Sequence, residues 1–592
     1  MLTKINRGGV LLLSSLLAVG FTACDDDDDY TVADAAIRNA VQVQYYDQKA
    51  DVANANFSLE WCGSSTIRII FNEGPFYNPV QAIGNIVATN GLEIKSTKAI
   101  FSEKAVDVEV YVPDLNKDYS VTFPLTEVHN GQGEYCTGSI EIKLNALPTP
   151  SIAQKPVMAT SDPANKLYSF LLANYGSKVL SGQMADVNWN DNISRQIGAT
   201  YGKTPLINGF DYIHLESSER SAGWIDYTDI TPVKNWVADG GIATIGWHWL
   251  VPAYPLYGQP EVALPAHLFD KAKVGDFVQV RMDKTSAKAI AEWKDADDNS
   301  IGKVDSIKGD LMFEIADAAM LAKVQAGGLK LIVTNGEKEE KNWAVLKDIK
   351  LAGNTLEWTE AELKDWYSKQ LPESTHNSYA YGPNADFKVD NIFSTETTWE
   401  KVCYEIGMEQ IIKNLTLLKE ANIPVLWRPY HEASGQWFWW GPSGDNGAAL
   451  HKQLWIDMFN RFREAGLDNL IWVWTSQVFD IETWYPGDEY VDIVGCDIYN
   501  KDVENCYLSF MNLKGKSSKI VTLSECGFNE QQKIEELSTI SSQFTRGCKW
   551  SWFMPWYDEE KSIKDGKYHA SPDFWRDAVA NPNILWLGDY TE

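Results

Sequence analysis

Eight short apolar runs lie between residues 178 and 553, and they constrain the fold more than any other feature of the sequence. Their ranges are 178–182, 204–209, 242–247, 424–428, 470–475, 491–497, 520–524 and 548–553. Most are separated by stretches such as 398–421 and 451–464, which place apolar residues at the three- and four-residue spacing of a helix. Eight strand–helix alternations predict an α/β fold, a (β/α)8 or TIM barrel, over residues 155–592.

The barrel pattern is interrupted between its third and fourth strands. The gap from Leu250 to Ile423 is far too long for one loop and one helix, so an insertion is expected there. Within residues 264–353, five runs have strand periodicity and β-type composition: 276–282, 287–293, 310–315, 329–333 and 344–351. The stretch 321–331, with Gly327 and Gly328 inside it, is expected to be a turn into a strand. The sequence therefore predicts an inserted β-rich, sandwich-like module.

A second β-rich segment, residues 31–146, precedes the barrel. Short alternating runs at 64–71, 106–112 and 139–144 are separated by turn residues, as in an Ig-like β-sandwich. A proline-rich joint at 147–150 ends this domain. Cys62 and Cys136 both lie in it, and the sequence leaves open whether they form a bridge. The segment contains no catalytic cluster, so spacer and glycan-binding domain are both open.

The first 30 residues predict an exported lipoprotein. Residues 1–23 read as a signal peptide, with Lys4 and Arg7 ahead of an apolar run at 10–21. The sequence ending at Cys24 resembles the lipobox of bacterial lipoproteins, although Phe21 replaces the usual leucine. The linker 24–30 carries five aspartates directly after Cys24. This resembles the surface-export signal of Bacteroidetes lipoproteins, which implies a lipidated Cys24 and the outer face of the outer membrane. A plain acidic linker on a periplasmic lipoprotein is the alternative.

The charge of the chain excludes one class of partner. Its 592 residues include 52 basic and 81 acidic side chains, and the formal net charge is −29. A surface this acidic repels phosphate backbones, so no nucleic-acid binding is expected. No apolar stretch after the N-terminus is long enough for a transmembrane helix, so contact with the membrane is expected only through the lipid anchor. Of the 24 tryptophans, only Trp61 lies in the first 150 residues. Acidic, tryptophan-rich exported proteins often handle carbohydrate, because indole rings stack on sugar rings.

Two glutamates stand at the ends of predicted barrel strands. The fourth strand runs into Arg428-Pro429-Tyr430-His431-Glu432, and the seventh runs into Ser524-Glu525-Cys526-Gly527. Because active sites of such barrels lie at the C-terminal ends of the strands, Glu432 and Glu525 are expected to face each other. This pair suits glycosidic cleavage, in which one carboxylic acid protonates the leaving oxygen and the other carboxylate attacks the anomeric carbon. A metal site is not expected, because His431 and Glu432 have no second convergent histidine.

The segment 428–441 closely resembles the strand-four signature of glycoside hydrolase family 26, whose best-known members are β-mannanases. Segments 472–476, 484–488, 492–499 and 523–527 continue the resemblance in the family's order. It covers residues 155–592 apart from the insertion. The resemblance implies that Glu432 is the general acid/base and Glu525 the nucleophile of a retaining double displacement. Glu432 must then start protonated, through burial among aromatic rings and the nearness of Glu525.

The resemblance also implies substrate-binding residues around this pair. Tyr499 is expected to hold Glu525 by a hydrogen bond, and Arg428 to orient the carboxylates. The other residues carried over are two histidines, two aromatic platforms and a strand-six aspartate: His248, His431, Trp437, Trp556 and Asp497. Core packing is the alternative for His248, and a purely structural role is the alternative for Asp497. Core packing also explains a further group of aromatic residues: Trp427, Trp439, Trp440, Trp472 and Trp474.

These features predict an endo-β-1,4-mannanase that cuts mannan, galactomannan or glucomannan outside the cell, as a monomer and without cofactor or metal. Relatives with this barrel imply two alternatives. One is exo-acting release of mannobiose, for which a loop within 354–392 could close the far negative subsites. The other is hydrolysis of mixed-linkage β-glucan or β-1,3-xylan. A non-catalytic glycan-binding lipoprotein would instead use the domains at 31–146 and 264–353. A purely structural surface protein leaves the tryptophan-rich strand ends unexplained.

Overall fold

The computed structural model describes the barrel almost completely and the two β-rich segments in part. The described residues are 41–46, 57–62, 66–71, 87–88, 90–100, 105–124, 139–144, 149–186, 189–215, 225–252, 261–285, 289–304, 310–335, 344–355, 359–370, 379–382, 387–477, 481–528, 538–558 and 568–590. The predicted signal peptide, the linker 24–30 with Cys24, and Cys136 of the candidate bridge lie outside them. In the part of the chain that is described, no helix is long and apolar enough to cross a membrane.

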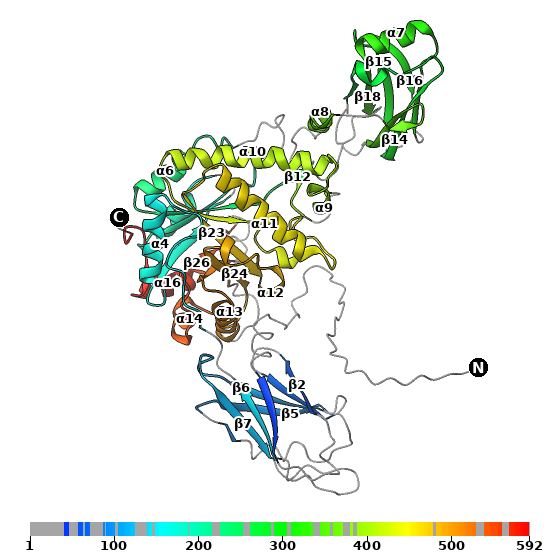
Figure 1. Ribbon diagram of the computed structural model, residues 1–592. Coiled ribbons are helices and arrows are strands. Elements are labelled where there is room, and N and C mark those ends of the chain that lie inside the picture. Colours follow the sequence, from blue (N-terminus) through cyan, green and yellow to red (C-terminus); the bar gives the residue numbers. More distant parts are fainter. Residues whose placement is uncertain are drawn as a thin grey trace, which may run out of the picture.

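Eight parallel strands close into a barrel, which confirms the predicted (β/α)8 fold (Figure 1). They are β9 (Val179–Met184), β10 (Ile207–Asp211), β11 (Ile242–Trp247), β22 (Val425–Pro429), β23 (Leu470–Gln477), β24 (Ile493–Tyr499), β25 (Ile520–Gly527) and β26 (Trp552–Pro555). Each strand pairs in parallel with the next, and β9 pairs with both β26 and β10 to close the ring. Each of the eight predicted runs overlaps one of these strands.

Two strands begin three or more residues later than predicted, for local reasons. β10 starts at Ile207 rather than at residue 204, since Pro205 has no amide hydrogen to give to a sheet. β26 starts at Trp552 rather than at residue 548. The amide of Cys548 donates to the carbonyl of Gln543, so it ends the preceding helix instead of opening a strand.

Helices surround the barrel strands in Figure 1. They are α4 (Asp162–Asn174), α5 (Asn192–Tyr201), α6 (Thr231–Ala238), α10 (Trp399–Glu420), α11 (Gly447–Glu464), α13 (Val503–Lys516), α14 (Ile540–Arg546) and α16 (Pro572–Ala580). The predicted helix at 398–421 is α10, and Thr398 caps it by accepting a hydrogen bond from the Lys401 amide. Every residue of β22 and β25 is buried, as expected of strands covered by helices on one face and barrel core on the other.

The insertion after β11 forms two four-stranded antiparallel sheets. One has the order β13–β18–β15–β16 and the other β17–β14–β19–β20. Their bounds are β13 (Glu261–Leu264), β14 (Phe277–Thr285), β15 (Ala289–Lys294), β16 (Ser300–Val304), β17 (Leu311–Glu314), β18 (Leu329–Asn335), β19 (Ala344–Leu351) and β20 (Asn354–Thr355). A hydrophobic core separate from the barrel core fills this module, hereafter the inserted module. In Figure 1 it stands away from the barrel, beyond helix α8 (Glu360–Gln370).

One prediction within the inserted module is wrong. Residues 321–327 form the end of helix α7 (Ala318–Gly327), not a turn. The alanine-rich start of this segment favours a helix, and Asp317 caps it by accepting a hydrogen bond from the Met320 amide. Gly328, with φ of +79°, ends the helix, and its Cβ would lie 2.2 Å from the Leu264 carbonyl oxygen. The strand that follows, β18, begins at Leu329.

The N-terminal segment also contains two four-stranded antiparallel sheets. Their orders are β1–β8–β7–β4 and β2–β3–β6–β5. The strands are β1 (Val41–Tyr46), β2 (Phe57–Cys62), β3 (Thr66–Phe71), β4 (Val87–Ala88), β5 (Glu93–Ile100), β6 (Ala105–Tyr111), β7 (Tyr119–Pro124) and β8 (Ser139–Leu144). Their assignment to an Ig-like sandwich stays a prediction. Arg546 of the barrel donates to the carbonyl oxygens of Val112 and Pro113 and also pairs with Glu504. These bonds hold the segment against the α13–α14 side of the barrel.

Candidate active site

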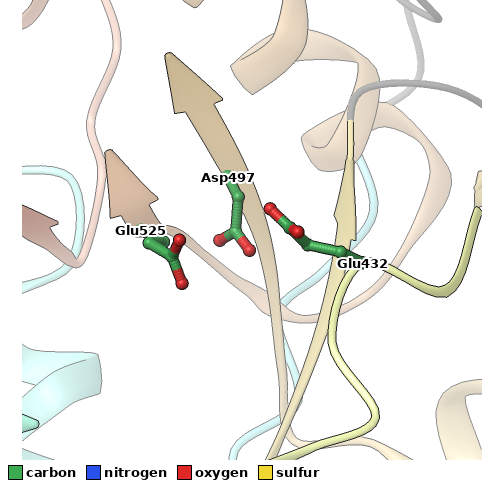
Figure 2. Close-up of side chains that lie close together, drawn as sticks. All are labelled: Glu432, Asp497 and Glu525. Carbon is green, nitrogen blue, oxygen red and sulfur yellow. The ribbon is translucent and has the colours of Figure 1, made fainter. Parts of the chain in front are cut away.

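Three carboxyl groups meet at the C-terminal mouth of the barrel. Asp497 and Glu525 lie near the ends of the adjacent strands β24 and β25, and Glu432 follows β22 (Figure 2). One oxygen from each lies within 4.8 Å of the others. All three residues are buried. The two glutamates predicted to face each other are therefore brought together, with an aspartate between them.

Glu432 sits in a strained turn at the top of β22. Its φ and ψ of 54° and 27° are left-handed, a conformation that non-glycine residues rarely adopt outside functional turns. Its amide donates to the Thr475 carbonyl at 3.2 Å, and Trp437 Nε1 donates to its Oε2 at 2.9 Å. Burial raises the pKa of Glu432 well above its usual range, and the charges of Asp497 and Glu525 raise it further. These effects favour the carboxylic acid form of Glu432 over the carboxylate.

Glu525 is held at both carboxyl oxygens. Arg428 Nη2 donates to Oε2 at 2.9 Å, and the Tyr499 hydroxyl donates to Oε1. Burial, followed by the charge of Glu525, raises the pKa of Tyr499 well above its usual range, so this hydroxyl keeps its proton. Two donors on two different oxygens fix the rotation of the carboxylate. These are the contacts that the sequence predicted for Arg428 and Tyr499.

Asp497 links the other groups of the site. Arg428 Nη2 donates to Oδ2, and Ser524 Oγ donates to Oδ1 at 2.8 Å. Burial raises the pKa of Asp497 to about 7, although the positive charge of Arg428 opposes the rise. Its side chain has no exposed surface. This burial favours the structural alternative, in which Asp497 holds its neighbours rather than touching a substrate.

The two predicted histidines lie side by side, His248 directly after β11 and His431 shortly after β22. The rings of His248 and His431 are 4.4 Å apart between centroids, and both residues are buried. Burial, followed by the nearness of Arg428 and His248, lowers the pKa of His431 well below its usual range, so this ring is neutral. The ring centroid of Trp556 lies 5.6 Å from that of His248, so this predicted platform lies beside the histidines.

Asp211 is a site residue that the sequence analysis missed. It ends β10, and its carboxylate accepts hydrogen bonds from His248 Nδ1 at 2.6 Å and from the His248 amide at 3.1 Å. Gly246 leaves room for it, because a Cβ at that position would lie 3.0 Å from Asp211 Oδ2. With Nδ1 bonded to Asp211, Nε2 is the ring nitrogen left to face the mouth. The signal in the sequence that could have revealed Asp211 is the presence of an aspartate at the end of a strand.

The model of glycosyl hydrolase family 26 matches residues 157–296 and 367–578, more than half of the sequence. This protein belongs to glycosyl hydrolase family 26. The two matched stretches span the barrel strands and the mouth just described.

The curated relatives match only part of this chain. A mannan endo-1,4-beta-mannosidase of Thermothelomyces thermophilus is 35% identical over 213 residues, which are 35% of this chain and 40% of the relative. Mannan endo-1,4-beta-mannosidase B of a Piromyces species is 34% identical over 193 residues, 32% of this chain and 30% of the relative. The chain thus spans less than half the length of these relatives. The solved family 26 domain of a Prevotella bryantii endo-beta-mannanase/endo-beta-glucanase is 26% identical, with a TM-score of 0.49, covering 74% of this chain and all of that one.

The family 26 barrel also separates aromatic residues of the mouth from those of the core. Trp437 is 38% exposed, whereas Trp427, Trp439, Trp440, Trp472 and Trp474 are buried, in line with core packing. Tyr381, which the sequence analysis did not single out, is 43% exposed, and its ring centroid lies 6.0 Å from that of His248. No pattern marked it, because it follows the inserted module and belongs to no long barrel strand.

The three carboxylates are also the group of described residues whose spacing could hold a metal ion. Arg428 donates to two of the three, Asp497 and Glu525, and thereby brings a positive charge to the cluster. A divalent cation would have to approach this guanidinium closely and displace its hydrogen bonds. The donor set fits a buried ion-pair network better than a metal centre.

Proposed function

We propose that this chain is an endo-β-1,4-mannanase that hydrolyses mannan, galactomannan or glucomannan with retention of configuration. The observation that carries the proposal is the spacing of Glu432 and Glu525, since one carboxyl oxygen of Glu432 lies within 4.8 Å of one carboxyl oxygen of Glu525. Retaining glycosidases hold their carboxyl groups about 5–5.5 Å apart, whereas inverting enzymes need about 6.5–9.5 Å to admit a water. Family membership and the names of the relatives support mannan as the substrate.

In the first step, Glu432 is the acid and Glu525 the nucleophile. An oxygen of Glu525 bonds to the anomeric carbon as the glycosidic bond breaks, and the Glu432 proton moves to the leaving oxygen. The leaving part of the polymer departs as an alcohol, with a glycosyl ester on Glu525 and a carboxylate on Glu432. Arg428 and Tyr499 hold the carboxyl group of Glu525 aligned before attack.

In the second step, Glu432 becomes the base. Esterified Glu525 is neutral, so one of the charges that raise the pKa of Glu432 is gone and the carboxylate form is favoured. Glu432 then takes a proton from water as the water oxygen attacks the anomeric carbon. The ester bond breaks, and Glu525 returns as a carboxylate. Asp497, held by Arg428 and Ser524, keeps its place next to both glutamates throughout.

The experiment is a time course on linear mannan, galactomannan, mixed-linkage β-glucan and β-1,3-xylan, with product analysis. Early release of several mannooligosaccharide lengths supports endo-action, and mannobiose alone from the start indicates exo-action. Activity on the glucan or the xylan alone would contradict the assignment of mannan as the substrate.

The roles of the two glutamates need variants. Glu525→Ala should abolish turnover of every substrate. Glu432→Ala should lose mannan hydrolysis but still release a burst of dinitrophenolate from a dinitrophenyl mannobioside, whose leaving group needs no proton, before slow hydrolysis of the glycosyl ester limits turnover. Glu400→Gln is the control, because burial raises the pKa of Glu400 to about 7 at a helix start outside the mouth. Equal losses in all three variants would overturn the assignments.

The remaining proposals rest on the sequence. We propose that Cys24 is lipidated and that the monomeric protein is displayed on the outer-membrane surface. Cys24→Ala should move the protein from the membrane fraction to the soluble fraction, and external protease should reach the wild type in intact cells. Glycan binding by the inserted module is tested by deleting 264–353 and measuring retention on insoluble mannan.

A further inference from the structure

Tyr381 stands at the rim of the mouth on a short strand. It directly follows β21 (Tyr379–Ala380), which pairs antiparallel with β12 (Val251–Pro252), the strand that leaves β11 past His248. Its carbonyl accepts a hydrogen bond from the Trp439 amide at 2.9 Å. The backbone of Tyr381 is thus tied both to the segment that carries His248 and to the loop that follows Glu432.

The ring of Tyr381 lies next to two other rings of the site. Its centroid lies 6.0 Å from that of His248 and 5.7 Å from that of Phe438. Tyr381 is nevertheless 43% exposed, so part of its surface is open to solvent. Among the described barrel residues, Tyr381 and Trp437 are the large apolar or aromatic side chains with this degree of exposure, and both lie at the mouth.

The two exposed rings, Tyr381 and Trp437, lie next to different groups of the site. Phe438 contacts both, with centroid distances of 5.7 Å to Tyr381 and 6.4 Å to Trp437. Trp437 donates a hydrogen bond to the acid Glu432, so it lies on the side of the leaving group. Tyr381 lies instead beside His248, which Asp211 orients. The two rings therefore border the mouth next to different groups, Trp437 beside the acid and Tyr381 beside His248.

We propose that Tyr381 is a sugar-binding residue that stacks on the pyranose next to the cleaved residue, on the glycone side. This rests on the proposed function, since the sugar in question belongs to a β-mannan chain. An exposed ring on a fixed backbone loses little entropy on binding and offers its face to the C–H groups of a pyranose. Tyr381 then sets how strongly the enzyme favours substrates that extend beyond the cleaved sugar.

The test compares substrates that reach Tyr381 with one that does not. For Tyr381→Ala, kcat/KM on mannotetraose to mannohexaose should fall about 10-fold, as expected for one lost stacking contact. Dinitrophenyl β-mannoside, which fills only the cleaved position, should be hydrolysed at the wild-type rate. Tyr381→Phe, which keeps the ring, should retain the wild-type preference, and Tyr381→Leu, which keeps bulk without a ring, should behave like alanine.

The control is Phe277→Ala, which removes an aromatic residue of similar exposure (41%) from the inserted module and should change none of these rates. Cleavage sites are mapped in H2¹⁸O, which marks the new reducing end. An equal loss on all substrates, no loss, or a loss that follows extension on the leaving-group side would overturn the proposal. If the wild type cleaves no β-mannan, the proposed function itself has failed, and the two failures are thereby distinguished.

Discussion

The guanidinium of Arg428 lies buried between two carboxylates, so its removal should destabilise the barrel in a pH-dependent manner. In Arg428→Met the side chain keeps its length and loses its charge. Asp497 and Glu525 then lose a shared donor, and Thr475 Oγ1 loses the hydrogen bond from Arg428 Nε at 3.1 Å. Removing one partner of a buried ion pair typically costs about 3–5 kcal/mol. At about 2 °C per kcal/mol for a domain of this size, Tm should fall by about 6–10 °C.

The pH dependence of this loss follows from Asp497. Its pKa in the folded protein is about 7, above the usual value of 3.8, so the folded state binds a proton that the unfolded chain releases. The resulting destabilisation is absent below about pH 4 and grows as the pH rises toward 7. Without Arg428 the pKa rises further, and the destabilisation continues to grow above pH 7. At pH 5 Asp497 is protonated in both proteins, so the variant's deficit should be smaller than at pH 8, by up to about 1.4 kcal/mol, because only one pH unit lies between the wild-type pKa of about 7 and pH 8.

The assay is thermal unfolding at pH 5 and pH 8, followed by tryptophan fluorescence, since most tryptophans lie in the barrel. Arg195→Met is a matched control, because Arg195 also bridges two carboxylates, Asp191 and Asp239, but at the surface. Exposed pairs contribute about 0–1 kcal/mol, so the control should lose little at either pH. A deficit in Arg428→Met that matches the control, or that is the same at both pH values, would refute the reasoning.

Two further predictions concern the protonation and orientation of site residues. Trp437→Phe removes the N–H that donates to Glu432 Oε2. Because such a donor favours the carboxylate, the pKa of Glu432 should rise, and the alkaline limb of the pH profile of kcat/KM should move to higher pH. An alkaline limb that stays in place or moves to lower pH would contradict this. Asp211→Ala frees Nδ1 of His248, so kcat/KM on mannan should fall about 10- to 100-fold, while Asp211→Asn, which still accepts one bond, should fall less. Equal losses in the two variants would argue against an orienting role.

Much of this architecture could be predicted from the sequence, because buried parallel strands read as continuous apolar runs. The same regularity predicted the meeting of Glu432 and Glu525, since the C-terminal ends of barrel strands converge on one mouth. Asp211 was missed because a single aspartate after a strand carries no distinguishing pattern. Tyr381 was missed because its position depends on a two-residue strand pairing across the whole inserted module. Residues 321–327, the end of α7, were predicted as part of a turn because the paired glycines outweighed the helix-forming residues before them.

The β12–β21 pairing also bears on how the barrel assembles. Barrel closure requires β11 to meet β22 across the segment from Trp247 to Val425, and each doubling of a flexible loop costs about 0.6 kcal/mol of chain entropy. The inserted module has its own hydrophobic core, and β12–β21 brings its entry and exit strands together. Once that pair forms, the chain between the third and fourth barrel strands behaves as a short connection. The β12–β21 pair joins the inserted module to the barrel at two neighbouring points. A whole domain can therefore be gained or lost there in a single genetic event without a change in the register of the barrel strands.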